Sequence, residues 1–206
     1  MATQPTLKFL YFGFPGRGGA IRDAFHIGKI AYTDEVQTFA TWGEKKKTAV
    51  WGGIPNLTVG AQTYGESNAI LRYVGKLAGL YPTDPLQALL VDEFVDAFEA
   101  PFNKIGASKS SDPEVFKAFR ISIANDFFPT FFAQVETRLS QLELPETGLL
   151  VGSLSIAELK LVNLVASFES GFFDHIPTDI FSKTGPLFSK LIADSQAAVS
   201  AAKINH

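Results

Sequence analysis

The sequence predicts an α/β unit followed by an all-helical unit, and three observations support this fold class. Over the first 80 or so residues, short strand-like runs alternate with segments of helical periodicity. The stretch LYPTDP at residues 80–85 then interrupts the pattern with two prolines. Beyond it, nearly every segment repeats apolar residues at helical spacing. We therefore expect an α/β domain at residues 1–81 and an all-helical domain at residues 86–206.

The first domain should contain its elements in the order β-α-β-α-β-β-α. Strands are expected at residues 7–12, 31–36, 54–59 and 62–64. A helix should follow Arg17, a loop or short helix should cover residues 41–50, and Ser67 should open a helix that closes near Gly79. The apolar stripe of that last helix comprises Ile70, Tyr73, Val74 and Leu77.

The second domain should consist of several helices with clear start signals. Helical segments are expected at residues 90–102, 113–131, 159–168 and 186–202. Pro113 and Pro186 can each begin a helix, and Pro129 should kink the one that contains it. Ser155, followed three residues later by Glu158, forms a capping box before the third segment.

Composition and charge exclude several classes of function. The chain has 206 residues and a net charge of −3, which argues against a nucleic-acid partner. It has no cysteine, so disulfides, thiolate nucleophiles and cysteine-bound zinc are excluded. The three histidines show no ligand spacing, and we expect neither a metal nor a cofactor. We find no signal-peptide pattern and no membrane-spanning run, and therefore expect a cytoplasmic protein.

The stretch LYFGFPGRGGAIRDAF, residues 10–25, places several glycines between an expected strand and an expected helix. Loops of this kind often bind phosphates, and two known patterns can be compared with it. The P-loop pattern needs Gly-Lys followed by Ser or Thr, which the sequence lacks. The dinucleotide pattern GxGxxG fits Gly16 and Gly18 but meets Ile21 where the third glycine belongs. A tight turn explains the glycines and leaves the role of Tyr11, at the strand end, open.

Several short motifs, in their order and spacing, resemble those of the cytosolic glutathione transferases, in particular the sigma class. They are Tyr11-Phe12, Gly16-Arg17, Ile21-Arg22, Trp42 with Lys46, Ile54-Pro55, ESNAILRY at residues 66–73, VDEFVDAF at residues 91–98 and LSIAEL at residues 154–159. Each motif is short, but together they span nearly the whole chain. The resemblance implies a thioredoxin-like domain followed by a helical domain, assembled as a homodimer, with glutathione as co-substrate.

The resemblance also implies that Tyr11 is the catalytic residue. A free thiol has a pKa of about 8.5, and a hydrogen-bond donor aimed at its sulfur favours the thiolate. A tyrosine hydroxyl, with a pKa of about 10, stays protonated and can be that donor. In the family, Arg17 supports the tyrosine and the sulfur electrostatically. On the residues alone, the alternatives are a core aromatic for Tyr11 and a surface ion pair for Arg17.

Six further residues match glutathione-binding positions of the family. Ile54-Pro55 implies a cis peptide bond that leaves the backbone of Ile54 free to pair with the cysteinyl unit. Glu66 and Ser67, the latter as a helix N-cap, match contacts to the γ-glutamyl end. Trp42 and Lys46 match contacts to the glycyl carboxylate. The alternatives are an edge-strand proline, a plain helix cap and a solvated lysine.

Asp92, Asp96 and Glu99 share one helix face, because they fall at i, i+4 and i+7. By resemblance, Asp96 and Glu99 are candidates for an acid that reaches the partner's glutathione, and a solvated acidic stripe is the alternative. A pocket for the electrophile could be bordered by Gly13, Phe14, Phe102 and Ile105, although core side chains look the same in sequence.

Three positions depart from the family pattern. Gly53 stands where a lysine or glutamine usually contacts glutathione, and Ala100 occupies the expected position of the cross-dimer acid. Trp51 replaces a smaller phenylalanine in the expected dimer contact. None of the three changes removes the thiol-activating group.

The leading hypothesis is a glutathione transferase in detoxification, whose thiolate attacks an electrophilic carbon in an apolar pocket. A glutathione-dependent isomerase of the prostaglandin D synthase type and a peroxidase acting on hydroperoxides are the enzymatic alternatives. A non-catalytic ligand-binding or structural protein is the remaining one, because fold does not fix function.

Overall fold

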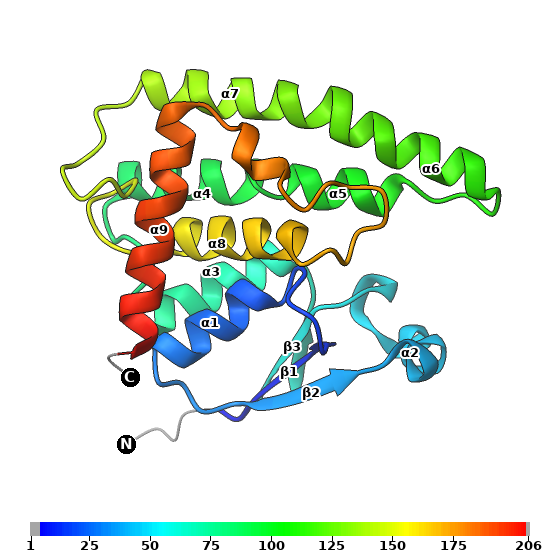
Figure 1. The fold of residues 1–206 in the computed structure, drawn as a ribbon. Coiled ribbons are helices and arrows are strands. Elements are labelled where there is room, and N and C mark those ends of the chain that lie inside the picture. The colour runs from blue at the N-terminus through cyan, green and yellow to red at the C-terminus, as the bar shows by residue number, and fades with distance from the viewer. Residues whose placement is uncertain (1–4, 205–206) are drawn as a thin grey trace.

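The computed structural model describes residues 5–204 and shows a four-stranded sheet with helices layered on one face (Figure 1). The strands are β1 (Leu7–Phe12), β2 (Thr33–Gln37), β3 (Asn56–Val59) and β4 (Gln62–Tyr64). Their order in the sheet is β2-β1-β3-β4, with β1 parallel to β2 and antiparallel to β3. The four expected strands are therefore confirmed, with β2 and β3 each beginning two residues later than expected.

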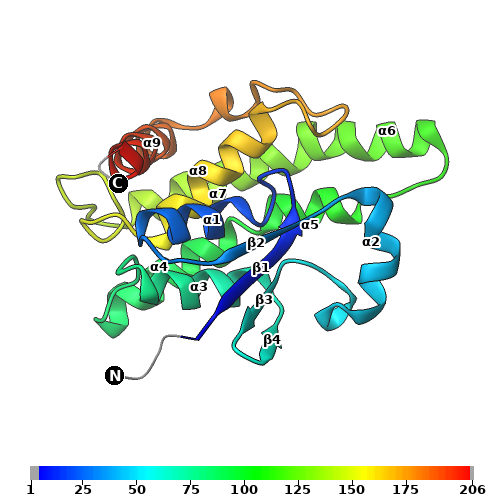
Figure 2. The ribbon, with the colours of Figure 1, turned by 90° about the horizontal axis from the view of Figure 1, so that it is seen from below.

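Helices α1 (Gly19–Ile27) and α3 (Ser67–Leu77) pack against each other on the same face of this sheet, as the view from below makes clear (Figure 2). Helix α2 (Phe39–Lys45) lies beyond β2 and continues into two short 3-10 turns at Lys46–Thr48 and Val50–Gly52. The mixed sheet with these helices is the thioredoxin-like arrangement that the resemblance implies.

The buried face of α3 differs from the expected stripe. Ile70 and Val74 are buried as expected, but Tyr73 and Leu77 are 37% and 47% exposed. Leu71 takes part in the core instead, at 1% exposure. The reason is that α3 presents this side to α1, about a quarter turn away from the face chosen by counting apolar residues.

The remaining chain is helical. Its elements are α4 (Pro85–Ala97), α5 (Ala100–Ala107), α6 (Pro113–Ser122), a π-helical turn η3 (Ile123–Phe127), α7 (Phe128–Ser140), α8 (Ile156–Glu169), a 3-10 turn η4 (Ile180–Lys183) and α9 (Pro186–Ile204). Pro113 and Pro186 begin helices as predicted. The bounds 1–81 and 86–206 stay our proposed domain limits.

Two helical segments differ in detail from expectation. The first is divided at Phe98 and Glu99 into α4 and α5. In the second, the disturbance expected at Pro129 takes the form of the π-helical turn just before it. Proline lacks the N–H that would continue the ladder, so the widened turn accommodates it.

Helix α8 lies at the centre of the molecule and packs against α1, α4 and α9. Its capping box is confirmed: the Ser155 hydroxyl accepts from the Ala157 N–H at 3.2 Å, and the Glu158 carboxylate accepts from the Ser155 N–H at 2.9 Å. Because α8 contacts α1, its side chains can reach the loop that precedes α1. Within residues 5–204, no helix combines the length and the apolar character that crossing a membrane requires.

Candidate active site at the end of the first strand

Tyr11 lies at the end of β1, 5% exposed, and the glycine-containing loop folds around its ring. The Arg17 backbone N–H donates to the Tyr11 hydroxyl oxygen at 2.9 Å. A Cβ built on Gly16, where φ is +39°, would lie 2.6 Å from that oxygen, and a Cβ on Gly18 would collide with the ring. The two glycines therefore allow the loop backbone to pack on Tyr11. This packing role adds to the tight turn by which the sequence analysis explained the glycines.

Burial raises the pKa of Tyr11 above its ordinary value, and the hydrogen bond from Arg17 only partly opposes this. The phenol therefore stays protonated throughout the neutral range. Because its oxygen accepts the bond from Arg17, the hydroxyl proton remains to be donated to another group. The Arg22 guanidinium lies 5.8 Å from the ring centroid and adds positive charge nearby.

A polar cavity of about 380 Å³ opens beside this loop. Its lining residues come from the β1–α1 loop, the 50–55 segment, the start of α3 and the α4–α5 junction: Arg17, Val50, Trp51, Gly53, Ile54, Pro55, Glu66, Ser67, Asn68, Glu99 and Asn103. Of the residues predicted to bind glutathione, the cavity brings together Ile54, Pro55, Glu66 and Ser67, with Arg17 beside them. The Ile54–Pro55 bond is cis.

The start of α3 forms one wall of the cavity. Glu66, not Ser67, occupies the N-cap position, and no side-chain cap closes the helix. Glu66 has a φ of 68°, in a region that non-glycine residues rarely adopt outside functional or tightly constrained sites. The uncapped N–H groups of the first turn therefore remain available to an anion in the cavity.

Three charged groups meet at the inner wall. The Glu99 carboxylate accepts hydrogen bonds from Arg17 Nε and from Lys160 Nζ. Arg17 Nη2 also donates to Asn103 Oδ1 at 2.9 Å, and Lys160 Nζ donates to Asn68 Oδ1 at 3.0 Å. The Arg17 side chain is thus ion-paired, as the alternative given in the sequence analysis expected. Its backbone N–H also bonds the Tyr11 hydroxyl.

Other predicted site residues lie outside the cavity lining. Trp42 is half-buried against Phe12, with ring centroids 5.9 Å apart, and Lys46 is exposed at the end of α2. Asp96 receives hydrogen bonds from Arg72 and Asn68, each at 2.8 Å, so it does not share the environment of Glu99.

The residues proposed for the electrophile pocket have different environments. Phe102 and Ile105 are buried in the core at 4% and 8% exposure. Phe14 instead stacks on Phe172, with centroids 4.7 Å apart, next to Phe12 at 5.2 Å. None of the four lines the polar cavity.

Sequence reasoning missed Lys160, Asn163 and the bridging role of Asn68. Lys160 and Asn163 lie in the apolar run of α8, and both are buried. Asn163 Nδ2 donates to the Gly16 carbonyl, which anchors the loop around Tyr11. A lysine and an asparagine within an apolar helix were a visible signal, because buried polar side chains require partners. Within the described part of the chain, no group of three or more His, Asp or Glu side chains could hold a metal ion.

The chain is similar to known proteins over most of its length. It is 29% identical to human "Glutathione S-transferase P" over 168 residues, which cover 81% of this chain and 78% of that protein. Its structure superposes on prostaglandin synthase D of Nilaparvata lugens with a TM-score of 0.79 and 25% identity, over 98% of this chain and 96% of that one.

A sigma class glutathione transferase of Fasciola hepatica has the same fold, with a TM-score of 0.74, 19% identity, and coverage of 95% of this chain and 91% of that one. No family model matches the sequence. The chain is thus similar to cytosolic glutathione S-transferases in sequence and in fold over most of its length, which bears out the resemblance and confirms the predicted fold.

Proposed function

We propose that the protein is a glutathione transferase in which Tyr11 holds the glutathione sulfur as a thiolate for attack on an apolar electrophile. The observation that carries this proposal is the geometry of Tyr11: a buried phenol whose oxygen accepts from the Arg17 N–H at 2.9 Å and whose proton is left to donate. The polar cavity beside it supplies room and charges for a tripeptide.

Glutathione carries two carboxylates and one ammonium, and the cavity offers partners of the opposite kind. The uncapped start of α3 at Ser67 suits the γ-glutamyl carboxylate, and the Glu66 carboxylate suits the ammonium. The Ile54 backbone, freed by the cis bond, pairs with the cysteinyl unit in the manner of an added strand. The glycyl carboxylate then extends toward Trp42 and Lys46 at α2. Gly53 offers no side chain there, which weakens binding.

Thiol activation follows from the chemistry of one donor. At neutral pH only a few per cent of a thiol with a pKa of about 8.5 is ionised. A phenolic O–H aimed at the sulfur stabilises the anion and lowers that pKa. Since burial raises the pKa of Tyr11, the phenol does not lose this proton in the working range.

The test is conjugation of glutathione to a chloro-nitroaromatic acceptor by the wild type and by Tyr11→Phe. We expect kcat to fall by about 100-fold, as when one preorganised donor is removed, with glutathione affinity nearly unchanged. Tyr32→Phe is the matched control, because Tyr32 also loses one hydroxyl but stacks on Phe25, with ring centroids 4.0 Å apart, and does not bond the Arg17 N–H as Tyr11 does. Ultraviolet absorbance of bound thiolate should disappear only in Tyr11→Phe.

The alternatives give other results in the same assays. If the wild type binds glutathione, forms no thiolate and converts no acceptor, the protein is a ligand-binding member of the family. If it forms thiolate but acts only on a prostaglandin endoperoxide or on organic hydroperoxides, the isomerase or peroxidase function replaces conjugation. The predicted cytoplasmic location and detoxification role stay predictions.

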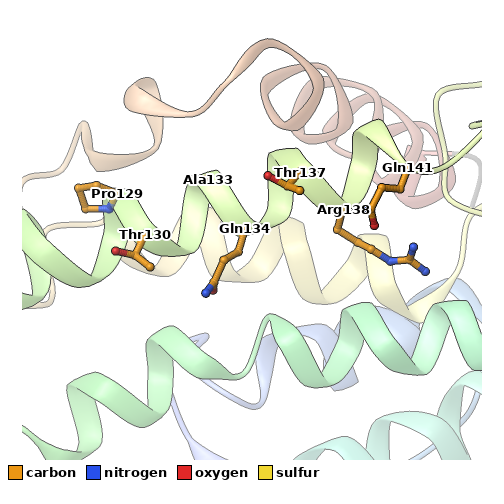
Figure 3. Close-up of a pocket in the computed structure, with 7 residues that line it drawn as sticks. All are labelled: Pro129, Thr130, Ala133, Gln134, Thr137, Arg138 and Gln141. Carbon is orange, nitrogen blue, oxygen red and sulfur yellow. The ribbon is translucent and has the colours of Figure 1, made fainter.

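A homodimer is part of the proposal, and Trp51 supports it. This side chain is 83% exposed at the cavity edge. A groove of about 300 Å³ between α4 and α7 offers a partly apolar seat for it on a second copy, with the apolar residues Phe94, Ala97, Phe131 and Val135 and the polar residues Glu93, Gln134 and Arg138 in its lining. Figure 3 shows a neighbouring pocket along α7, with Thr130, Gln134 and Arg138 among its lining residues, and the last two of these also line the groove.

In such a dimer, Asp96 is the better candidate for the cross-dimer acid. Its side chain is 61% exposed, whereas Glu99 is 14% exposed and engaged by two cations of its own chain. Sedimentation of the wild type decides the oligomeric state, and a monomer at micromolar concentration would remove this part of the proposal.

A further inference from the structure

Lys160 is a lysine in the interior of the protein. Its side chain is 2% exposed, and it lies in α8 between the buried residues Leu159 and Leu161. A buried ammonium is unfavourable unless it is paired and hydrogen-bonded. Its Nζ meets both conditions, through Glu99 Oε2 and through Asn68 Oδ1 at 3.0 Å. The ring centroid of Phe102, 5.6 Å away, covers another side of the ammonium.

The partners of Lys160 are residues of the active-site cavity, although Lys160 itself does not line it. Asn68 belongs to the first turn of α3, next to Ser67, and Glu99 lies at the α4–α5 junction. Lys160 therefore joins three helices from behind the cavity wall. A ligand that occupies the cavity meets Asn68 and Glu99, in positions that the lysine holds.

Glu99 links Lys160 to Arg17, because its carboxylate bonds both side chains. One carboxylate oxygen accepts from Lys160 Nζ and the other from Arg17 Nε. With both oxygens engaged, the plane of the carboxylate is fixed, and so is the Arg17 side chain that it holds.

Arg17 in turn contacts Tyr11 through its backbone N–H. It lies between Gly16 and Gly18 in a turn that is closed by hydrogen bonds from the Gly18 and Gly19 N–H groups to the Pro15 carbonyl, at 2.9 and 2.7 Å. The anchored side chain and the Asn163 bond to Gly16 together place the Arg17 N–H, which donates to the Tyr11 hydroxyl.

We propose that Lys160 is a positioning residue for thiol activation: it holds and neutralises Glu99 and, through Arg17, sets the hydroxyl of Tyr11. This inference rests on the proposed function. The thiolate that Tyr11 stabilises is negative, and Glu99 is a negative group in the wall of the same cavity. With Lys160 in place, two cations flank Glu99. Without it, one cation remains, and the carboxylate opposes ionisation of the thiol.

Removing the charge of Lys160 and removing the charge of Glu99 should therefore shift the pKa of the bound thiol in opposite directions. Lys160→Met keeps the length of the side chain and removes its charge, so the pKa of the bound thiol should rise. Glu99→Gln keeps an oxygen to accept from Arg17 and removes the negative charge, so that pKa should fall. The other charged groups facing the network are Arg22 over the Tyr11 ring, and Asp96 with its partner Arg72 on the Asn68 side.

The experiment titrates the ultraviolet absorbance of enzyme-bound glutathione thiolate against pH, together with kcat and KM for the chloro-nitroaromatic acceptor. For Lys160→Met we expect a rise of about one pKa unit, hence about tenfold less thiolate and a matching loss of kcat on the acid limb of the profile. KM for glutathione should change little. The double variant Lys160→Met/Glu99→Gln, which has no carboxylate at position 99 to oppose the thiolate, should return toward the wild type. Lys190→Met, an exposed lysine on α9, is the control and should match the wild type.

Each outcome decides one point. If Lys160→Met forms thiolate with the wild-type pKa, and merely unfolds more easily, Lys160 is structural and the inference is overturned. If Lys160→Met does not fold, Glu99→Gln is compared with the double variant, and equal thiol pKa values in those two overturn it as well. If the wild type itself binds glutathione without forming thiolate, the proposed function fails and this inference falls with it.

Discussion

Two clusters of charged side chains meet at Asn68, and they differ mainly in how far water reaches them. The buried cluster consists of Arg17, Glu99 and Lys160, whose side chains are 31%, 14% and 2% exposed, so its burial lies in Glu99 and Lys160. The exposed cluster consists of Arg72, Asp92 and Asp96, whose side chains are 26%, 31% and 61% exposed. Asn68 joins them, because its oxygen accepts from Lys160 and its nitrogen donates to Asp96.

The comparison shows that residue type does not decide what a charged group does. Both clusters use an arginine and carboxylates at hydrogen-bonding distance. In the exposed cluster, water solvates each charge nearly as well as the partner does, so the pairs contribute little to stability. In the buried cluster, each charge depends on its partner, because removal of one leaves the other without solvent. The buried cluster is also the one that touches Tyr11.

The largest expected difference is the effect of breaking each cluster on folding. Glu99→Ala leaves two buried or half-buried cations without their carboxylate, and we expect a loss of about 3–5 kcal/mol in the free energy of unfolding. Urea unfolding followed by circular dichroism measures it. Glu44→Ala, which breaks the exposed pair with Lys47 at 2.8 Å, is the control and should have little effect. A loss as small as that of the control would mean that water reaches Glu99 freely.

A second difference concerns pH. Burial lowers the pKa of Lys160, and its carboxylate partner Glu99 offsets this only in part. Since the folded-state pKa is lower than the unfolded value of about 10.4, the unfolded chain binds more protons between the two values. The free energy of unfolding of the wild type should therefore increase, relative to that of Lys160→Met, as the pH rises from the folded-state pKa of Lys160 toward the unfolded value of about 10.4. Urea midpoints of the two proteins at a series of alkaline pH values measure this difference in stability. A difference that does not change with pH would contradict the lowered pKa of Lys160.

The smallest effect is expected in the exposed cluster. Arg72→Met breaks the bonds to Asp92 at 2.6 Å and to Asp96 at 2.8 Å, and we expect a loss of about 1 kcal/mol or less. Screening over about 3 Å at 1 M salt should reduce this loss further, whereas the effect of Glu99→Ala should persist. Unfolding of both variants at low and high salt makes the comparison. Equal salt sensitivity would show that the two clusters share one environment.

Features that depend on neighbouring residues were predictable. The strand at Leu7–Phe12, the capping box of Ser155 and Glu158, and the helix starts at Pro113 and Pro186 follow from local chemistry, and all are confirmed. Tyr11 could be singled out as well, because the motif that contains it is contiguous.

Features that depend on distant contacts were missed or misjudged. The exposed Tyr73 was expected in the core, because counting apolar residues does not say which side of α3 faces α1. Lys160 and Glu99, which bond each other, are 61 residues apart in the sequence, and Asn163 and Gly16 are 147 residues apart. Neither pairing leaves a local pattern, so the network behind Tyr11 could not be predicted.

The sequence by itself determined the α/β-then-helical order of elements, the resemblance to glutathione transferases and the tyrosine on which the proposed chemistry depends, because periodicity, capping and short motifs are local properties of the chain. Only the tertiary structure decided why Gly16 and Gly18 are needed, which acid faces the cavity and which lysine stands behind it. Those choices arise when α8 packs against α1 and α4, since burial turns an ordinary lysine and glutamate into partners that cannot be separated without loss.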